Sequence, residues 1–464
     1  MNFRTVLGWL IKSLKWGFLA LIAIYGLLLA INAVDEDPSP EMKALIATPQ
    51  VNVDPANGYL AMVGLNAPLN EDAFKYGARW VETFNAAASS AAVKDALGRF
   101  TSGALTFKGS DKQLCDPRKT PCLPKAREHA EAWRKLAADN EVLLSRQRHL
   151  MDYPQFEEIY FQRHFESPMP SYLSNVQRLA LDLIAVDAAE GRLEPALVAL
   201  EALIAFDRRT LQGARTLLTG MVATSRLRND YALLGEIVAA RPAALAAQKS
   251  RLDRMTEPLE IQQVRTIAGR LYEGESRLLS NGLTSVENKG ILFQDWLVND
   301  SMIVSMLTAP FFKLNGTLNM MARSHMTMQS RILEFSPENT AAWRSQIEQD
   351  YVKQGLTYDP YSPHFWYNPV GKILVAVGAR SGNDDYFLRL FDLTGVTRLA
   401  RLQVDVVTAG IADADIPARI AANKTLYDPY TGKTMGWDAD KKRLYFDGQS
   451  KPPEGSTKRT HAGI

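Results

Sequence analysis

One apolar run near the N-terminus constrains this chain more than any other feature. Residues 16–34 read WGFLALIAIYGLLLAINAV, with Asn32 as the one clearly polar side chain. At 1.5 Å per residue, a helix of about this length crosses the ~30 Å hydrocarbon core of a bilayer. Basic residues precede the run and the acidic residues 35–37 follow it. Because lysine and arginine are retained on the cytoplasmic side, we expect the chain to run N-in and C-out.

A cleaved signal peptide is the alternative interpretation of this run. Signal peptides have a shorter apolar region and end in small residues at the cleavage site. The best candidate here is Ile31-Asn32-Ala33, which places a bulky branched residue where a small one is preferred. We therefore interpret the run as an uncleaved anchor. Both interpretations place the rest of the chain outside the cytoplasm.

Composition describes an ordinary globular body with no electrostatic bias. The chain has 464 residues, of which 46% are hydrophobic and 22% charged, and its net charge is +2. That is enough apolar material for a large core or for two domains. A nearly balanced charge gives no reason to expect nucleic acid as a partner.

The two cysteines, Cys115 and Cys122, lie in the short sequence CDPRKTPC. In an oxidising compartment this spacing favours a local disulfide that pins one loop, worth about 2–3 kcal/mol in the chain-entropy model. A redox pair and a metal site are the alternatives. Redox motifs usually have two intervening residues, and a zinc site needs further ligands, for which His129 is the only nearby histidine.

The patterning predicts a mainly α fold: an N-terminal transmembrane helix, a large helical bundle or irregular helical repeat, and a small α+β C-terminal unit with a hairpin. The expected segments are a cytoplasmic segment at 1–15, the transmembrane helix at 16–34, a linker at 35–55, an extracytoplasmic helical domain at 56–350, a connector at 351–369, the α+β unit at 370–452 and a disordered tail at 453–464.

The helical domain carries the clearest periodicity. Between 193 and 204, apolar residues recur at three and four, as on one helix face, and Pro195 suits the first turn. The pattern A-x-E-G-R-x-x-x-A-L at 188–197 is similar to a tetratricopeptide-type helix–turn–helix. A full 34-residue repeat is not evident, so we predict a bundle or irregular repeat in which such helix pairs are possible.

Turn and capping signals organise both ends of the body. Asn57-Gly58 suits either a turn or the N-cap of a helix that starts near Tyr59, and Asn368-Pro369 suits the start of a helix. Near the C-terminus, residues 434–437 and 443–446 are expected to pair as a hairpin.

The segment around that hairpin resembles the end of many membrane-anchored or secreted bacterial envelope proteins. The residues that carry the resemblance are Asp428-Pro429-Tyr430-Thr431-Gly432-Lys433, with Thr434 where proline is usual. The sequences NGY at 57–59 and PFFKLNGTLN at 310–319 add to it. The resemblance implies a bacterial envelope protein and no activity. Together with the apolar run, it leads us to expect a single-pass inner-membrane protein with its body in the periplasm.

The search for catalytic motifs is mostly negative: the sequence has no G-x-S-x-G elbow, P-loop, H-E-x-x-H or EF-hand loop. Glu157 and Glu158, with His164 nearby, lie among several aromatic residues. Such a setting can raise a carboxyl pKa, and sugar-cleaving enzymes use acids of this kind. The simpler interpretation is that the aromatics are core and the acids face water or a neighbouring arginine.

A Met- and Phe-rich stretch at 301–328 has two interpretations. It is either a buried core helix or an adaptable apolar groove, because thioethers fit varied apolar partners. The candidate groove residues are Met302, Met306, Phe311 and Met320.

Three hypotheses of function remain open at this point. The first is a scaffold or protein-binding module of the cell envelope, whose partners are the membrane and other envelope proteins. The second is a periplasmic hydrolase acting on cell-wall or glycan material through carboxylates, and the third is a carrier of lipid or another apolar ligand. The absent motifs favour the first and a protein that is not an enzyme, with no cofactor or metal expected.

Overall fold

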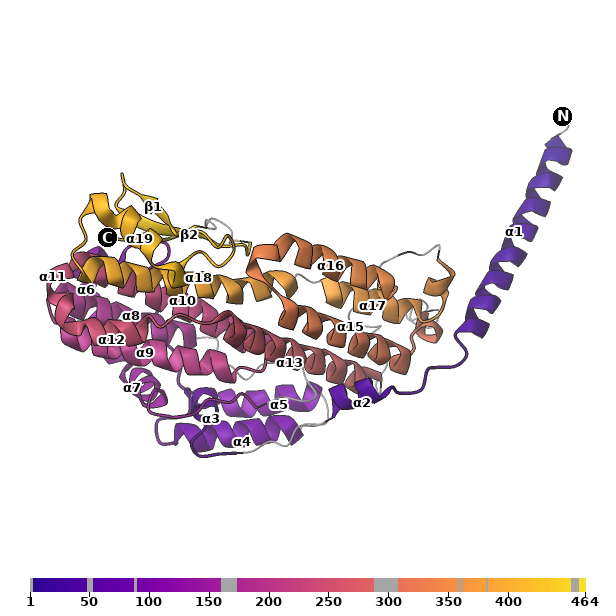
Figure 1. Ribbon diagram of the computed structural model, residues 1–464. Coiled ribbons are helices and arrows are strands. Elements are labelled where there is room, and N and C mark those ends of the chain that lie inside the picture. The colour runs from indigo at the N-terminus through magenta and orange to yellow at the C-terminus, as the bar shows by residue number, and fades with distance from the viewer. Residues whose placement is uncertain are drawn as a thin grey trace. The chain divides into compact units, whose positions relative to one another are not determined.

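The computed structural model describes residues 3–47, 53–86, 90–159, 173–287, 308–356, 359, 362–380, 383–451 and 459–464. The mainly helical fold predicted from sequence is confirmed, with a small antiparallel sheet near the C-terminus (Figure 1). The chain forms two compact units: unit 1 is Met1–Ala47, Leu279–Met328 and Ser345–Ser381, and unit 2 is Thr48–Leu278, Gln329–Arg344 and Gly382–Ile464. The segments predicted at 56–350 and 370–452 each contribute residues to both units.

Unit 1 contains the apolar N-terminal helix and the elements around its C-terminal end. They are α1 (Phe3–Ile31), α2 (Pro40–Ile46), η4 (Ala309–Phe311), most of α15 (Leu314–Glu334), part of α16 (Thr340–Lys353), η6 (Pro363–Trp366) and α17 (Pro369–Arg380). The short helix α2 lies within the predicted linker, and it packs Met42 and Leu45 against Leu318 and Ala322 of α15. Asn368 caps α17 as expected, since its Oδ1 accepts the N–H of Gly371 at 3.1 Å.

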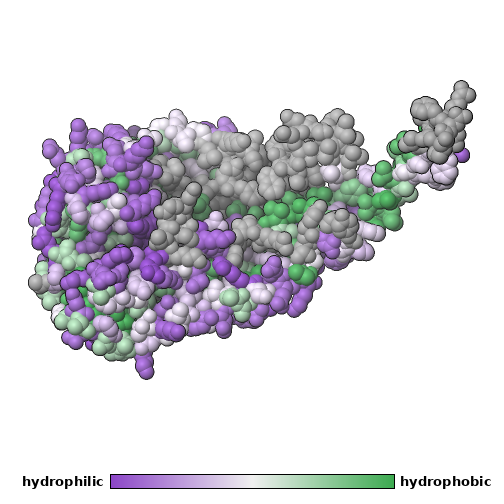
Figure 2. Space-filling view, turned by 90° about the horizontal axis from the view of Figure 1, so that it is seen from above, coloured by the Kyte–Doolittle hydropathy of each residue, from purple (hydrophilic) through white to green (hydrophobic). Residues whose placement is uncertain are grey.

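The helix α1 is the one described helix long and apolar enough to cross a membrane. The qualifying stretch is Ile11–Ile31, and none of its most apolar window is buried. In Figure 2 it forms a green surface next to the grey N-terminal residues.

Unit 2 is a helical bundle with the sheet attached. Its helices are α3 (Gly58–Val63), α4 (Ala73–Ala86), α5 (Ser90–Thr101), η1 (Asp111–Gln113), α6 (Cys122–Asp139), α7 (Glu141–Leu150), α8 (Leu173–Ala189), α9 (Leu193–Gly213), α10 (Leu217–Ala240), α11 (Pro242–Leu245), η2 (Ala246–Gln248), α12 (Lys249–Met255), most of α13 (Ile261–Glu287), η5 (Pro337–Asn339), α18 (Asn383–Thr408), η7 (Asp413–Asp415), α19 (Ile416–Ala422) and η8 (Lys424–Leu426).

The predicted stripe on α9 forms part of the core of unit 2. Leu197, Leu200, Leu203 and Ile204 are all buried. Gly191 makes the turn between α8 and α9 with a φ of +86°, a conformation that glycine adopts without strain. The other start signal is also confirmed, because Asn57 caps α3 by accepting the N–H of Tyr59.

The predicted hairpin is confirmed, but the predicted disorder of the tail is wrong for its last residues. The strand β1 (Gly436–Asp438) pairs antiparallel with β2 (Arg443–Asp447), and β3 (Arg459–Gly463) adds to the other side of β2. The physical reason is that residues of β3 form specific contacts with β2, which the polar composition of the tail does not predict. Arg459 pairs with Asp447 at 2.7 Å and stacks over the ring of Tyr445.

Candidate functional site

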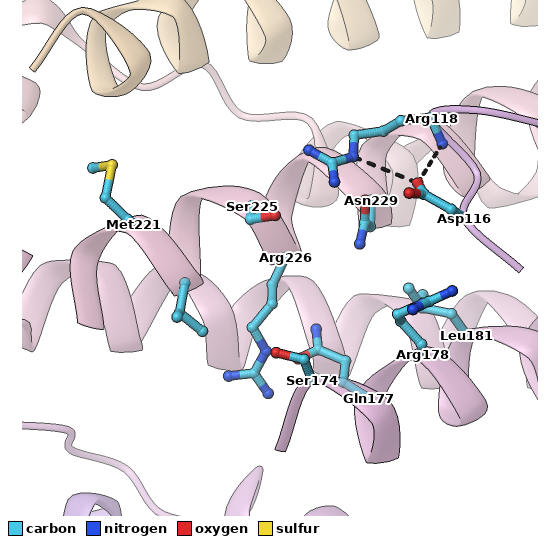
Figure 3. A pocket seen from close by; sticks show the side chains of 11 residues that line it. Asp116, Arg118, Ser174, Gln177, Arg178, Leu181, Met221, Ser225, Arg226 and Asn229 are labelled. Carbon is cyan, nitrogen blue, oxygen red and sulfur yellow. Dashed lines mark hydrogen bonds and ion pairs between the residues drawn. The ribbon is translucent and has the colours of Figure 1, made fainter. Parts of the chain in front are cut away.

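Unit 2 contains a cavity of about 290 Å³ between faces of α8 and α10. Along α8 its lining residues are spaced at three and four, and along α10 they follow the same helical period, so each set lies on one face of its helix. The lining residues are Ser174, Gln177, Arg178 and Leu181 from α8, Met221, Val222, Ser225, Arg226 and Asn229 from α10, and Asp116 and Arg118 from the loop before α6. We call it the arginine cavity; Figure 3 shows its side chains.

The loop that carries Asp116 and Arg118 is the cysteine loop. The Sγ atoms of Cys115 and Cys122 lie at disulfide distance, and their Cα atoms are 5.9 Å apart. Arg178 also holds this loop, because its guanidinium donates to the carbonyl oxygens of Leu114 and Cys115 at 3.1 and 3.3 Å. The predicted disulfide therefore shapes one wall of the cavity.

Two carboxylates on the bundle helices hold the two ends of this loop. Asp182 of α8 accepts the N–H of Cys115 at 3.2 Å. Glu236 of α10 accepts the N–H groups of Cys122 and Leu123 at 2.7 and 2.9 Å, which are orphan donors in the first turn of α6. Burial raises the pKa of Asp182 to about 8 and that of Glu236 to about 7, and the N–H donors only partly oppose this.

Among the described residues, one group of three potential metal ligands was found. It consists of the two cysteines of this loop and Asp182 of α8. The sulfurs of Cys115 and Cys122 and a carboxylate oxygen of Asp182 lie within 4.8 Å of one another. A sulfur joined in a disulfide is not a thiolate, and the thiolate is the form that binds zinc. In the disulfide form, this group therefore does not fit a metal.

Arg226 is the central polar residue of the cavity wall. It is only 4% exposed, and no guanidinium nitrogen has a hydrogen-bond partner among the described residues. Arg226 forms an ion pair with Asp207, with 3.5 Å between nitrogen and oxygen. Its guanidinium carbon also lies over the ring of Phe206, 5.7 Å from the ring centroid. Figure 3 shows it reaching from α10 toward Ser174 and Gln177 of α8.

Behind Arg226, the two carboxyls of Asp207 and Asp230 are fully buried. Burial raises the pKa of each, and for Asp230 the neighbouring charge of Asp207 raises it further. Burial and the repulsion between the two carboxyls therefore favour one negative charge on the pair rather than two. This single charge faces the single charge of Arg226.

The cavity lining as a whole is cationic. Three guanidinium groups, from Arg118, Arg178 and Arg226, face one carboxylate, from Asp116. Asp116 pairs with Arg118 at 3.6 Å. Burial lowers the pKa of Arg118, Asp116 opposes this, and repulsion from Arg228 and Arg178 adds to the lowering. This arrangement is suited to binding an anion.

In unit 1, polar side chains meet where α1 ends. Asn32 donates to the carbonyl of Trp366 at 2.8 Å and accepts the N–H of Asn368 at 2.7 Å. Asp35 accepts the N–H groups of Asn315 and Gly316 at 2.9 and 3.0 Å, and so caps α15.

Two further amides complete this arrangement. Asn319 accepts the N–H of Ser39 at 2.9 Å and donates to the carbonyl of Asp37 at 2.9 Å. Asn368 accepts the N–H of Lys313 at 2.9 Å and donates to Thr317 at 3.0 Å. We call Asn32, Asp35, Asn319 and Asn368 the exit clamp.

The carboxylates singled out from sequence have structural partners. Glu158 is 5% exposed and caps α10, because its oxygens accept the N–H and hydroxyl of Thr216 and the hydroxyl of Thr219 at 2.6–2.7 Å. Glu157 is exposed and pairs with Arg215. His164 lies outside the described residues. Neither Glu157 nor Glu158 lines the arginine cavity.

Of the predicted groove residues, Met302 and Met306 also lie outside the described residues. Phe311 packs edge-on against Tyr25 of α1, with ring centroids 5.6 Å apart. Met320 is buried on α15. Neither of these two lines the arginine cavity.

Sequence reasoning missed the arginine cavity, although a signal was present. Asp207 falls at the next step of the apolar α9 stripe that includes Leu203, and SRLRND at 225–230 places charges on several faces of a strongly helical segment. A charge at a core position requires a partner or a ligand.

Comparison with known proteins gives no family assignment. The chain matches no protein-family model, no curated protein and no solved structure.

Proposed function

We propose that this chain is a single-pass protein of the bacterial inner membrane, with its N-terminus in the cytoplasm and its body in the periplasm. In this proposal the body is a scaffold or protein-binding module of the cell envelope. The exposed apolar surface of α1 supports the anchor, since Ile11–Ile31 is long enough to span a bilayer. The envelope assignment keeps the support of the DPYTGK segment at 428–433.

The exit clamp is the observation that carries the proposal. A flexible tether needs no ordered contacts. Here, by contrast, the four side chains of the exit clamp form hydrogen bonds that join the residues after α1 to the start of α15 and to the segment before α17. Three features noted in the sequence meet there: Asn32, the acidic residues 35–37 and the sequence at 310–319. Such a fixed mounting suits a protein that presents a surface at a defined orientation to the membrane.

A contact of α1 adds support for a position close to the lipid. Tyr25 lies six residues before Ile31, which is about 9 Å along the helix. If α1 spans the bilayer, Tyr25 is then below the lipid surface, and Phe311 beside it lies at the same depth. An aromatic residue at that level is typical of a membrane interface.

Two measurements test the proposal. A reporter active only in the cytosol, fused to the C-terminus, should stay inactive, while the same reporter at the N-terminus should be active.

After crosslinking in cells and purification in mild detergent, tagged full-length protein should retain specific partners. Asp35→Ala should alter that set, because it removes the cap on α15, and Asp95→Ala on exposed α5 is the control. An active C-terminal reporter overturns the topology, and a protein that purifies alone and monomeric overturns the scaffold.

A further inference from the structure

We propose that the arginine cavity of unit 2 binds a small organic anion, through a carboxylate or phosphate group held by Arg226 and Arg118. The proposal concerns a ligand site inside the body, so it stands apart from the membrane topology. Its basis is the combination of a cavity, an uncompensated positive charge and buried polar atoms that lack partners.

The first step is charge. Arg178 donates its hydrogen bonds to loop carbonyls, which are neutral, and its ion-pair partner Asp111, at 3.7 Å, is 70% exposed. Asp116 compensates Arg118. Arg226 faces a carboxyl pair whose one negative charge balances its own, so the excess positive charge of the lining is that of Arg178, and an anion would neutralise it.

The second step is hydrogen bonding. A buried guanidinium offers five N–H donors, and buried donors are almost always paired. Within the described ranges, Arg226 uses none of them, and the amide oxygens Gln177 Oε1 and Asn229 Oδ1 are also without a hydrogen bond. Donors and acceptors that lie together unpaired require water or a ligand with both kinds of group.

The third step is size and shape. At about 290 Å³ the cavity is at the lower end for small-molecule sites, so it fits a metabolite-sized molecule. Leu181, Met221 and Val222 supply an apolar part of the wall, and Ser174 and Ser225 supply hydroxyls. The fitting ligand is therefore a short apolar or aromatic group bearing one anionic head.

The fourth step connects the site to the cysteines. Arg118 lies inside the loop closed by Cys115 and Cys122, whereas Arg226 lies on a helix. Opening the disulfide removes the covalent closure of the loop that carries Arg118, so that only the hydrogen bonds to Asp182, Glu236 and Arg178 hold its ends, and it leaves α10 intact. Reduction should therefore weaken anion binding while much of the site remains.

The experiment uses full-length protein in mild detergent and three probes that share a phenyl group, measured by titration calorimetry. Benzoate and phenyl phosphate carry the two candidate heads, and benzamide is the neutral control. We expect saturable binding of at least one anion, with benzamide at least about tenfold weaker. The tighter of the two anions identifies the head group.

Variants locate the binding. Arg118→Gln changes a partly exposed loop residue, and Arg226→Lys keeps the charge but loses the planar fork; each should weaken binding about tenfold. Arg127→Gln, on an exposed position of α6, should leave it unchanged. Reduction should act in the same direction as Arg118→Gln.

Three outcomes overturn the proposal: no saturable binding of either anion, which leaves a water-filled cavity; equal binding of benzamide; or anion binding that neither cavity variant changes. If Arg226→Lys fails to fold, Arg118→Gln and reduction of the disulfide still decide the question.

Discussion

In unit 1, the polar side chains of the exit clamp all have hydrogen-bond partners, most of them backbone groups of neighbouring segments. Asn32 and Asn368 use both their donor and acceptor atoms, and Asp35 accepts two helix N–H groups. In unit 2, Arg226 and Asn229 line a cavity with atoms that no described residue pairs. Matched polar groups fasten segments together, whereas unmatched ones at a cavity are available to a ligand. The pairing of polar groups therefore distinguishes the exit clamp, which joins segments of unit 1, from the candidate binding site in unit 2.

The largest expected effect comes from removing the charge at the cavity. Arg226→Met leaves Asp207 and Asp230 without a buried cation, which should destabilise unit 2 by about 3–5 kcal/mol at neutral pH. Urea unfolding followed by circular dichroism measures this. The double variant Arg226→Met/Asp207→Asn should recover much of the loss, because the remaining carboxyl can stay protonated. Equal instability of the two variants would mean that Arg226 acts through packing alone.

A slightly smaller effect is expected at the exit clamp. Asn368→Ala removes the hydrogen bonds to Lys313 and Thr317 from a residue that is fully buried, and should cost about 3 kcal/mol locally. Hydrogen exchange should become faster at the N-terminus of α15 while unit 2 is unaffected. Asn315→Ala is the matched control, since only the backbone of Asn315 binds Asp35. Unchanged exchange would show that the clamp does not fasten α15.

A third prediction concerns pH at the cysteine loop. The pKa of Asp182 rises on folding from 3.8 to about 8, so the folded state binds the proton more tightly and stability falls as pH rises across that range. Arg178 and Lys125 oppose this rise. Glu236 acts in the same direction, but only up to a pH of about 7. Asp182→Asn should therefore reduce the pH dependence of the melting temperature between about pH 4 and 8, and most completely above about pH 7, where Glu236 no longer contributes; Asp139→Asn, which is exposed, should not.

The smallest effect tests the membrane side of unit 1. A spin label at Phe311→Cys should be accessible to oxygen and protected from a water-soluble relaxation agent in reconstituted vesicles. This follows because Phe311 contacts Tyr25 within the apolar part of α1. A label at Val198→Cys on α9 should show the opposite pattern. Equal exposure of the two labels to water would contradict the placement of Phe311 at lipid depth.

Local signals in the sequence predicted much of the fold. The α9 stripe, the caps at Asn57 and Asn368, and the pairing of Cys115 with Cys122 each depend on residues close together in the chain. Such signals are sufficient because helix periodicity, capping and short-loop closure are short-range effects.

The exit clamp and the arginine cavity depend on long-range contacts, and those could not be predicted. Asp35 caps α15 through Asn315, which lies 280 residues later, and a single sequence contains nothing that links the two. The cavity joins a loop and two helices whose polar faces resemble solvated surfaces when each is considered alone. The strand β3 was missed for a related reason. Its residues are held by partners in β2, as Arg459 is by Asp447, and the sequence of β3 alone does not show them.

The disulfide has a consequence for when the protein can work. If the body is exported as proposed, a newly synthesised chain still in the reducing cytosol would carry Arg118 on a loop that no disulfide closes, and export followed by oxidation would complete the wall of the cavity. Ligand capture would then begin after translocation, so the molecule would not compete for the same small anions at its site of synthesis.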